Sequence, residues 1–118
     1  MSAAKRKGTA AETAVVNYLR TRGWPHAERR ALNGAGDRGD IAGVVGTVIE
    51  VKAHARMELA AWLDETARET ENDGAKYGVT WHKRRGRGSP GDWFVTMDGD
   101  TFVRLLADAL GIEGTGRD

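Results

Sequence analysis

The chain has 118 residues, 18 basic and 17 acidic side chains, and no cysteine. This length suits one domain with its own hydrophobic core, and the missing cysteine excludes disulfides and thiolate metal sites. The apolar runs are too short for a membrane span, and a signal-peptide core is lacking, so we expect a cytoplasmic protein without a membrane partner. The net charge of +1 conceals separated charges, with basic residues at 5–7, 29–30 and 82–87 and acids between 64 and 73.

The first seven residues are small and basic, and we expect them to form a flexible arm that contacts phosphate. Thr9 and Glu12 have the spacing of a capping box, so a helix is predicted over 9–22, with Gly23 as its stop. Glu12 closes that box on the simplest interpretation. It also shares a helical stripe with Val15 and Leu19, which predicts an inward carboxylate in need of a partner such as a metal.

A strand is predicted over 24–31, where Arg29 and Arg30 point to opposite faces. Residues 33–39 form a glycine-containing loop. A phosphate-cradling pattern followed by a helix is lacking, so no nucleotide cofactor is expected. Asp37 in this loop competes with Asp40 as the functional aspartate. Asp40 is preferred because Ile41 and Ala42 continue as a strand.

Residues 40–52 predict a β-hairpin whose second strand, 47–53, is rich in β-branched residues. Glu50 and Lys52 lie two apart and therefore leave the same face of that strand. A three-residue loop ending in Gly46 would set Asp40 opposite Glu50 on that face. A two-residue loop would send Asp40 to the other face. Two carboxylates beside a lysine suit Mg²⁺, which prefers oxygen ligands and stabilises developing negative charge.

The rest of the chain predicts a helix over 58–72, a strand over 77–83, a strand over 92–97 and a helix over 101–110. The buried stripe of the first of these helices is predicted at Leu59, Leu63, Thr66, Ala67 and Thr70, with its acids mostly solvated. In the last helix, we expect Phe102, Leu105, Leu106 and Leu110 to be buried. The tail 112–118 is expected to be flexible. His54 follows Lys52 without an assigned role.

Asp40, nine residues and then Glu50-Val51-Lys52 resemble the bipartite motif of the PD-(D/E)xK nuclease superfamily. Together with Lys7-Gly8-Thr9 and Glu12, the pattern is most similar to archaeal-type and phage-type Holliday junction resolvases. Gly39 replaces the proline that names the superfamily. The resemblance implies one restriction-endonuclease-like α/β domain over 1–118, with a central mixed five-stranded sheet flanked by helices.

The resemblance also implies a function: Mg²⁺-dependent hydrolysis of DNA at four-way junctions, with Mn²⁺ able to substitute. Asp40, Glu50 and Glu12 would hold the metal, and Lys52 would orient or activate the attacking water. Glu65 is the one candidate for a polar residue that related resolvases carry on the second helix. Paired cuts predict a homodimer.

The basic side chains expected to contact DNA are Lys7, Arg29, Arg30, Lys83, Arg84, Arg85 and Arg87. The loop 84–89 is the main candidate, because it is short, positive and rich in glycine. A solvated hairpin tip would have the same composition. Two other functions remain open: a phage or restriction-like nuclease that acts on duplex, nicked or flapped DNA, and a non-catalytic DNA-binding module.

Overall fold

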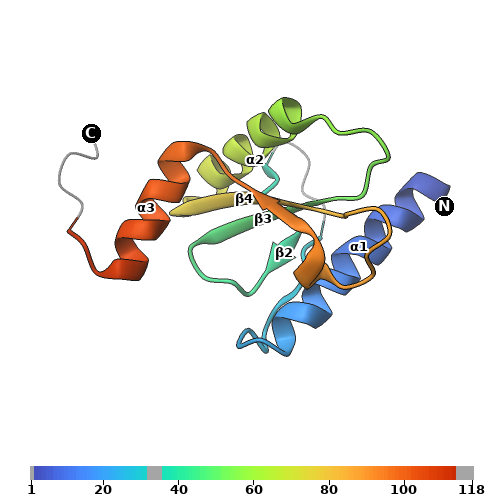
Figure 1. Ribbon diagram of the computed structural model, residues 1–118, viewed down its shortest axis with the longest axis horizontal. Coiled ribbons are helices and arrows are strands. Elements are labelled where there is room, and N and C mark those ends of the chain that lie inside the picture. The colour runs from blue at the N-terminus through green and yellow to red at the C-terminus, as the bar shows by residue number, and fades with distance from the viewer. Residues whose placement is uncertain (1, 32–35, 114–118) are drawn as a thin grey trace.

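The computed structural model describes residues 2–31 and 36–113. These residues include three α-helices, five strands and the short 3₁₀ helix η2. In chain order the elements are α1 (Ala3–Arg20), β1 (Glu28–Arg29), β2 (Ile41–Ala42), β3 (Thr47–Lys52), α2 (Leu59–Asp73), β4 (Tyr77–His82), η2 (Pro90–Asp92), β5 (Phe94–Thr96) and α3 (Gly99–Leu110). The predicted α/β class is confirmed, and Figure 1 shows helices on both sides of the strands.

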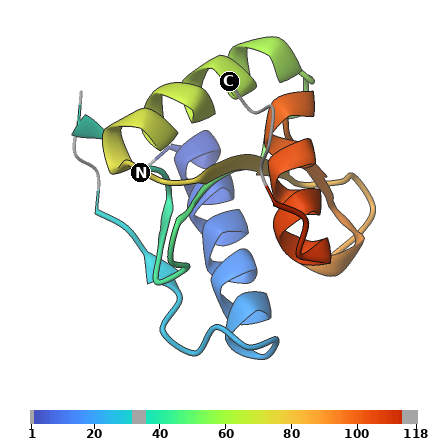
Figure 2. The same cartoon turned by 90° about the vertical axis from the view of Figure 1, so that its left-hand side faces the viewer.

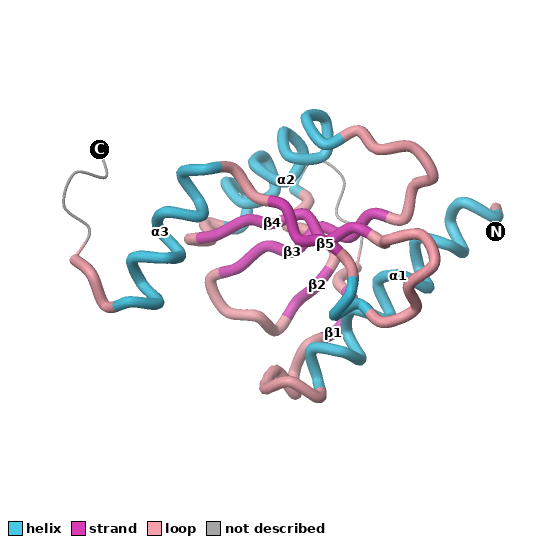
Figure 3. Tube along the Cα trace, in the orientation of Figure 1, coloured by secondary structure: helices cyan, strands magenta, loops and turns pink. Residues whose placement is uncertain are grey.

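The strands form two small sheets, so the expected five-stranded sheet is wrong. β3, β4 and β5 make one sheet, with β3 parallel to β4 and β4 antiparallel to β5. β1 and β2 form a separate two-residue antiparallel pair. The expected hairpin ladder between residues 40–42 and β3 is therefore also wrong, because β2 pairs with β1 (Figure 3). A single backbone bond, from Asp40 N to Ile49 O at 3.0 Å, joins the two segments where the hairpin was expected.

The core lies between α1 and one face of the larger sheet. Val15, Val16 and Leu19 of α1 pack in one cluster with Ile49 and Val51 of β3. Because strand side chains alternate, Glu50 and Lys52 leave the other face, toward α2. α2 connects the parallel strands β3 and β4, and it covers this second face (Figure 2). The β3–α2–β4 unit thus places the charged pair under a helix.

The predicted basic arm is helical rather than flexible from residue 3 onward. α1 begins six residues before the predicted start, and its N-cap is Ser2, whose hydroxyl accepts from Lys5 N at 3.1 Å. Thr9 and Glu12 therefore lie inside the helix, so the predicted capping box is wrong. In the part of the chain that the structure describes, no helix is both long enough and apolar enough to cross a bilayer. Most of the tail, 114–118, lies outside the described residues.

The last helix has its predicted position in the chain, but its apolar side chains face solvent instead of the core. Asp98 caps it as expected, accepting from Thr101 N at 2.7 Å. Thr101 is its one buried residue, whereas Phe102, Leu106 and Leu110 are 52%, 43% and 65% exposed. Leu105 is also exposed, so the prediction that these four apolar side chains are buried is wrong.

Candidate functional site

Asp40 is held at the free edge of β3 by hydrogen bonds on both sides. Its backbone N donates to Ile49 O at 3.0 Å, and its Oδ2 accepts from Val51 N at 2.7 Å. Its own carbonyl accepts from Arg30 N at 2.7 Å. These bonds direct the carboxylate across the strand edge toward Glu50. The convergence of Asp40 and Glu50 is thus achieved by side-chain capture of a backbone N–H rather than by hairpin register.

Lys52 lies between two carboxylates. Its Nζ is 2.7 Å from Glu65 Oε1 and 3.3 Å from Glu50 Oε2. Burial pushes the pKa of Lys52 down, but the hydrogen bond to Glu65 and the charge of Glu50 outweigh it, so the pKa rises above its usual value. The same contact holds the pKa of Glu65 below its usual value despite partial burial. Lys52 is therefore a fixed cation, suited to orienting an anion or a water.

Asp40 and Glu50 share a crowded, buried environment. Burial raises the pKa of Asp40 to about 6, and the nearby charge of Glu12 adds to the shift. Burial raises the pKa of Glu50 to about 11, reinforced by the negative charges of Asp40 and Glu69. Like charges this close cannot all stay ionised without a compensating cation or shared protons. The site is therefore prepared to take up positive charge.

Glu69 is a member of this cluster that the sequence interpretation placed on a solvated face. It is 3% exposed, and neither carboxylate oxygen has a hydrogen-bond partner among the described residues. Glu50 Oε1 is likewise buried without one. Burial raises the pKa of Glu69 to about 8. Glu69 lies three and seven residues after Thr66 and Trp62, the other buried residues of α2. That spacing is the signal that could have revealed its inward direction.

Three carboxylates come close enough to hold one metal ion. Glu50, Glu65 and Glu69 each offer an oxygen, and these oxygens lie within 4.8 Å of one another. Within residues 2–31 and 36–113, the predicted ligands Glu12, Asp40 and Glu50 do not form such a set. Glu12 instead has its Oε1 3.0 Å from Nε of Arg29. It still lines the same hollow as Asp40 and Glu50.

Two hollows meet at these carboxylates. One, of about 320 Å³, is bordered by Glu12, Asp40, Glu50 and Lys52. The second, of about 440 Å³, is also bordered by Asp40 and Glu12. The basic residues lining this second hollow are Lys5, Arg29 and Arg30. The buried Nε of Arg30 has no partner among the described residues, so this wall has a free donor for an anion.

The basic loop reaches the site through a third hollow of about 180 Å³. It is lined by Lys7, Lys83 and Arg85 together with His54, which also borders the carboxylate hollow. Arg84 instead lies 5.1 Å from the ring centroid of Phe94, and Arg87 is exposed and borders neither hollow. Three of the predicted DNA contacts, Lys7, Lys83 and Arg85, thus surround the approach to the site, whereas Arg84 and Arg87 do not border it.

Other residues near the site have structural contacts. Asp37 Oδ1 accepts from Gly39 N at 2.9 Å, and the negative charge of Asp37 helps to raise the pKa of Glu69. The ring of His54 lies 5.6 Å from that of Trp62, centroid to centroid. Part of the predicted loop 33–39 lies outside the described residues.

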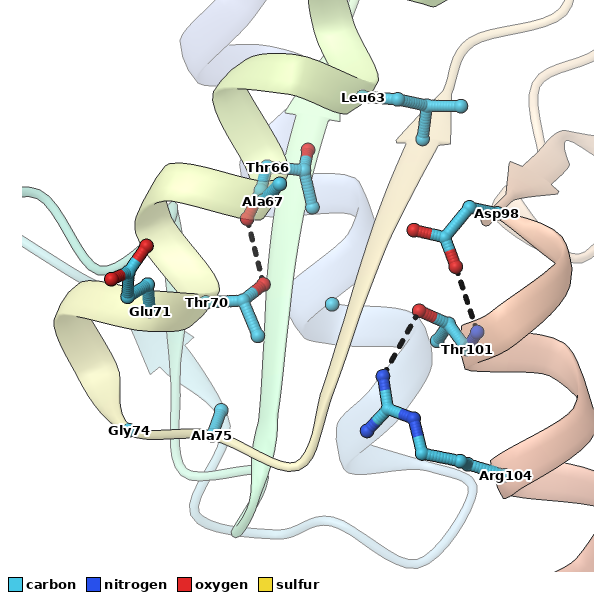
Figure 4. A pocket seen from close by; sticks show the side chains of 11 residues that line it. Leu63, Thr66, Ala67, Thr70, Glu71, Gly74, Ala75, Asp98, Thr101 and Arg104 are labelled. Carbon is cyan, nitrogen blue, oxygen red and sulfur yellow. Dashed lines mark hydrogen bonds between the residues drawn. The ribbon is translucent and has the colours of Figure 1, made fainter. Parts of the chain in front are cut away.

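A further hollow, of about 450 Å³, lies elsewhere. It separates α2 and β4 from α3, and Asp40, Glu50 and Lys52 do not border it (Figure 4).

Comparison of the chain with protein-family models, with curated proteins and with solved structures gave no match.

Proposed function

We propose that the protein is a Mg²⁺-dependent DNA endonuclease of the PD-(D/E)xK type, for which a four-way junction is the first candidate substrate. One observation carries this proposal. Asp40, Glu50 and Lys52, the three motif residues, border a single hollow although Asp40 lies outside β3, the strand that carries the other two. A common exposed Glu-x-Lys pair would be solvated, whereas this Glu50 is 4% exposed.

The donor set fits a hard divalent cation. Three buried carboxylate oxygens, one on Glu50 and two on Glu69, lack hydrogen-bond partners among the described residues. Mg²⁺ prefers carboxylate and water oxygens, and Mn²⁺ accepts the same ligands. Asp40 and Glu50 are the proposed ligands at the hollow, and Glu12 of α1, which borders the same hollow, would support the ion. Glu65 and Glu69 add two further carboxylates next to Glu50. A second ion bound by these three residues would share Glu50 with the first ion.

When bound, the cation supplies Lewis-acid stabilisation of negative charge on the phosphate. The chain's own residues carry out the remaining work. Lys52, kept protonated by Glu65, orients an anionic oxygen or a water at the hollow. Asp40, fixed by Val51 N, keeps its carboxylate in place without rearrangement. Lys7, Lys83 and Arg85 attract the DNA backbone on one side, and Arg29 and Arg30 on the other.

The test compares cleavage of a synthetic four-way junction and of a linear duplex of matching sequence, with Mg²⁺. We expect Asp40→Asn to lower the cleavage rate at least about a hundredfold while DNA binding is retained. Asp37→Asn is the matched control, because it removes the competing aspartate three residues away. The site assignment is wrong if Asp40→Asn cuts at the wild-type rate.

The DNA products separate the remaining functions. Paired symmetric nicks in the junction alone would support a resolvase and a homodimer with two sites. Equal cutting of both DNAs would keep the nuclease and favour a phage or restriction-like enzyme. Tight binding without any cutting would favour the DNA-binding module.

A further inference from the structure

The apolar face of α3 points away from the rest of the molecule. Its six exposed large apolar side chains, counting Ile112 just after the helix, have exposures between 37% and 65%. They are Phe102, Val103, Leu105, Leu106, Leu110 and Ile112. A helix at the surface of a monomer normally turns such a stripe inward, with its polar residues in solvent. α3 does the reverse.

Polar contacts attach α3 to the body and fix this orientation. Arg104 donates to the carbonyl of Lys76 from Nη1 and to Thr101 Oγ1 from Nη2. Lys76 in turn pairs with Asp108 at 2.6 Å. Figure 4 shows Thr101 and Arg104 turned toward α2 across the hollow of about 450 Å³. The side of α3 that faces the protein is therefore polar and loosely packed.

The exposed area corresponds to one partner's share of a dimer. A fully exposed large apolar residue has roughly 150–200 Å² of surface, and these six are about half exposed on average, so together they present on the order of 500 Å². A standard interface buries about 800 Å² per partner, and in homodimers about 65% of that is apolar, or roughly 520 Å². The two figures agree, so a second identical face is sufficient to cover this one.

The charges around the face favour a second copy over DNA or a lipid surface. α3 has a single basic residue, Arg104, which is already paired with Asp100 at 3.1 Å. Asp100 and Asp108 are the other charged residues of the helix, so it has little attraction for a polyanion or an anionic membrane. Because these charges are paired, the α3 faces of two copies would not repel each other electrostatically.

We propose that α3 is the interface of a symmetric homodimer, in which the α3 helices of two copies pack against each other. Phe102, Leu106 and Leu110 follow one another at intervals of four residues, and Val103 lies beside them, which forms a seam of two helical turns. Leu106 lies at the centre of this seam. In an isologous interface the central residue lies near the twofold axis and meets its own copy. This proposal does not depend on the nuclease activity.

Sedimentation equilibrium tests the interface with two matched valines. Val103 lies on the face, whereas Val45 is 99% exposed in the turn before β3. We expect the wild type to have twice the monomer mass of 12.8 kDa. Val103→Asp places an aspartate in the interface twice per dimer, so its dissociation constant should rise at least about a hundredfold. Val45→Asp should sediment like the wild type. A monomeric wild type, or equal dimerisation of both variants, would overturn the proposal.

A cysteine variant gives a second readout that does not depend on weakening the fold. The chain has no cysteine, so Leu106→Cys introduces a single thiol. Near a twofold axis the two thiols can meet the spacing of a disulfide, with Cα atoms about 4.4–6.8 Å apart. We expect Leu106→Cys to form a covalent dimer on mild oxidation much faster than Val45→Cys at the same concentration. Equal rates for the two variants would exclude α3 as the interface.

Discussion

Replacing Glu69 by glutamine should stabilise the metal-free protein at neutral pH. Glu69 is buried beside Glu50, and its pKa is raised to about 8. A carboxyl group whose pKa is higher in the folded state than in the unfolded state binds its proton more tightly when folded. Its contribution is therefore complete below the unfolded pKa and is lost as the pH rises toward the folded value. Glutamine has the same shape but does not titrate.

The size of the effect follows from the two pKa values. The usual pKa of a glutamate is 4.5, and the pKa of Glu69 in the folded protein is about 8. At 1.36 kcal/mol per unit, raising the pH from about 4.5 to about 7 costs the wild type about 3 kcal/mol of unfolding free energy at this residue. Glu69→Gln should avoid most of that loss. Near pH 4.5 the two proteins should have similar stability.

Urea denaturation at pH 5 and pH 7, with EDTA present, measures this difference. The control is Glu71→Gln, an exposed glutamate on the same helix. We expect the control to lose as much stability as the wild type over this range, and Glu69→Gln to lose clearly less. The same pH profile for both variants would show that Glu69 is not confined next to Glu50. Added Mg²⁺ should stabilise the wild type more than Glu69→Gln if the cation binds this cluster.

Two further predictions concern the turn before β3 and the basic loop. Gly43 has a φ of +90°, and an added Cβ would collide with the backbone carbonyl of His26, whereas Gly46, with a φ of +73°, faces open space. Gly46→Ala should cost about 1 kcal/mol and Gly43→Ala more than about 3 kcal/mol, measured by thermal unfolding. Replacing residues 83–85 together by alanine should weaken DNA binding and reduce its salt dependence, measured by fluorescence anisotropy. An unchanged slope of DNA affinity against salt concentration would mean that residues 83–85 form a solvated hairpin tip without DNA contacts.

The sequence predicted the order of elements well, because turn signals and periodicity are local. Glycines ended α2 and α3 as expected, with Gly74 and Gly111 in the left-handed region. The pairing of the strands was predicted less well. Residues 41–42 could pair with either neighbour, and the choice of β1 over β3 depends on packing of the whole chain. The short strands β1 and β2 therefore pair with each other and are not part of the predicted central sheet.

The sequence predicted the motif residues of the site, but it did not predict the residues that surround them. Glu50 and Lys52 were predicted on one face because side chains alternate along a strand. Asp40 borders the same hollow, but it is held there by its bond to Val51 N rather than by the predicted hairpin register. Glu69 was missed because an acidic residue on a charged helix is normally solvated, and only the three-dimensional position of α2 over β3 buries it. Glu12 was expected at the metal, but its pairing with Arg29 depends on a contact 17 residues away.

The place of α3 has a consequence for any paired cuts. Figure 1 shows α3 at one end of the long axis and the first turn of α1, next to the carboxylate hollow, at the other. That axis is 47 Å long, and DNA rises about 3.4 Å per base pair, so it spans roughly 14 base pairs. A dimer joined through α3 would hold its two hollows apart by more than about one turn of duplex. The spacing between paired nicks therefore measures which surface joins the two copies.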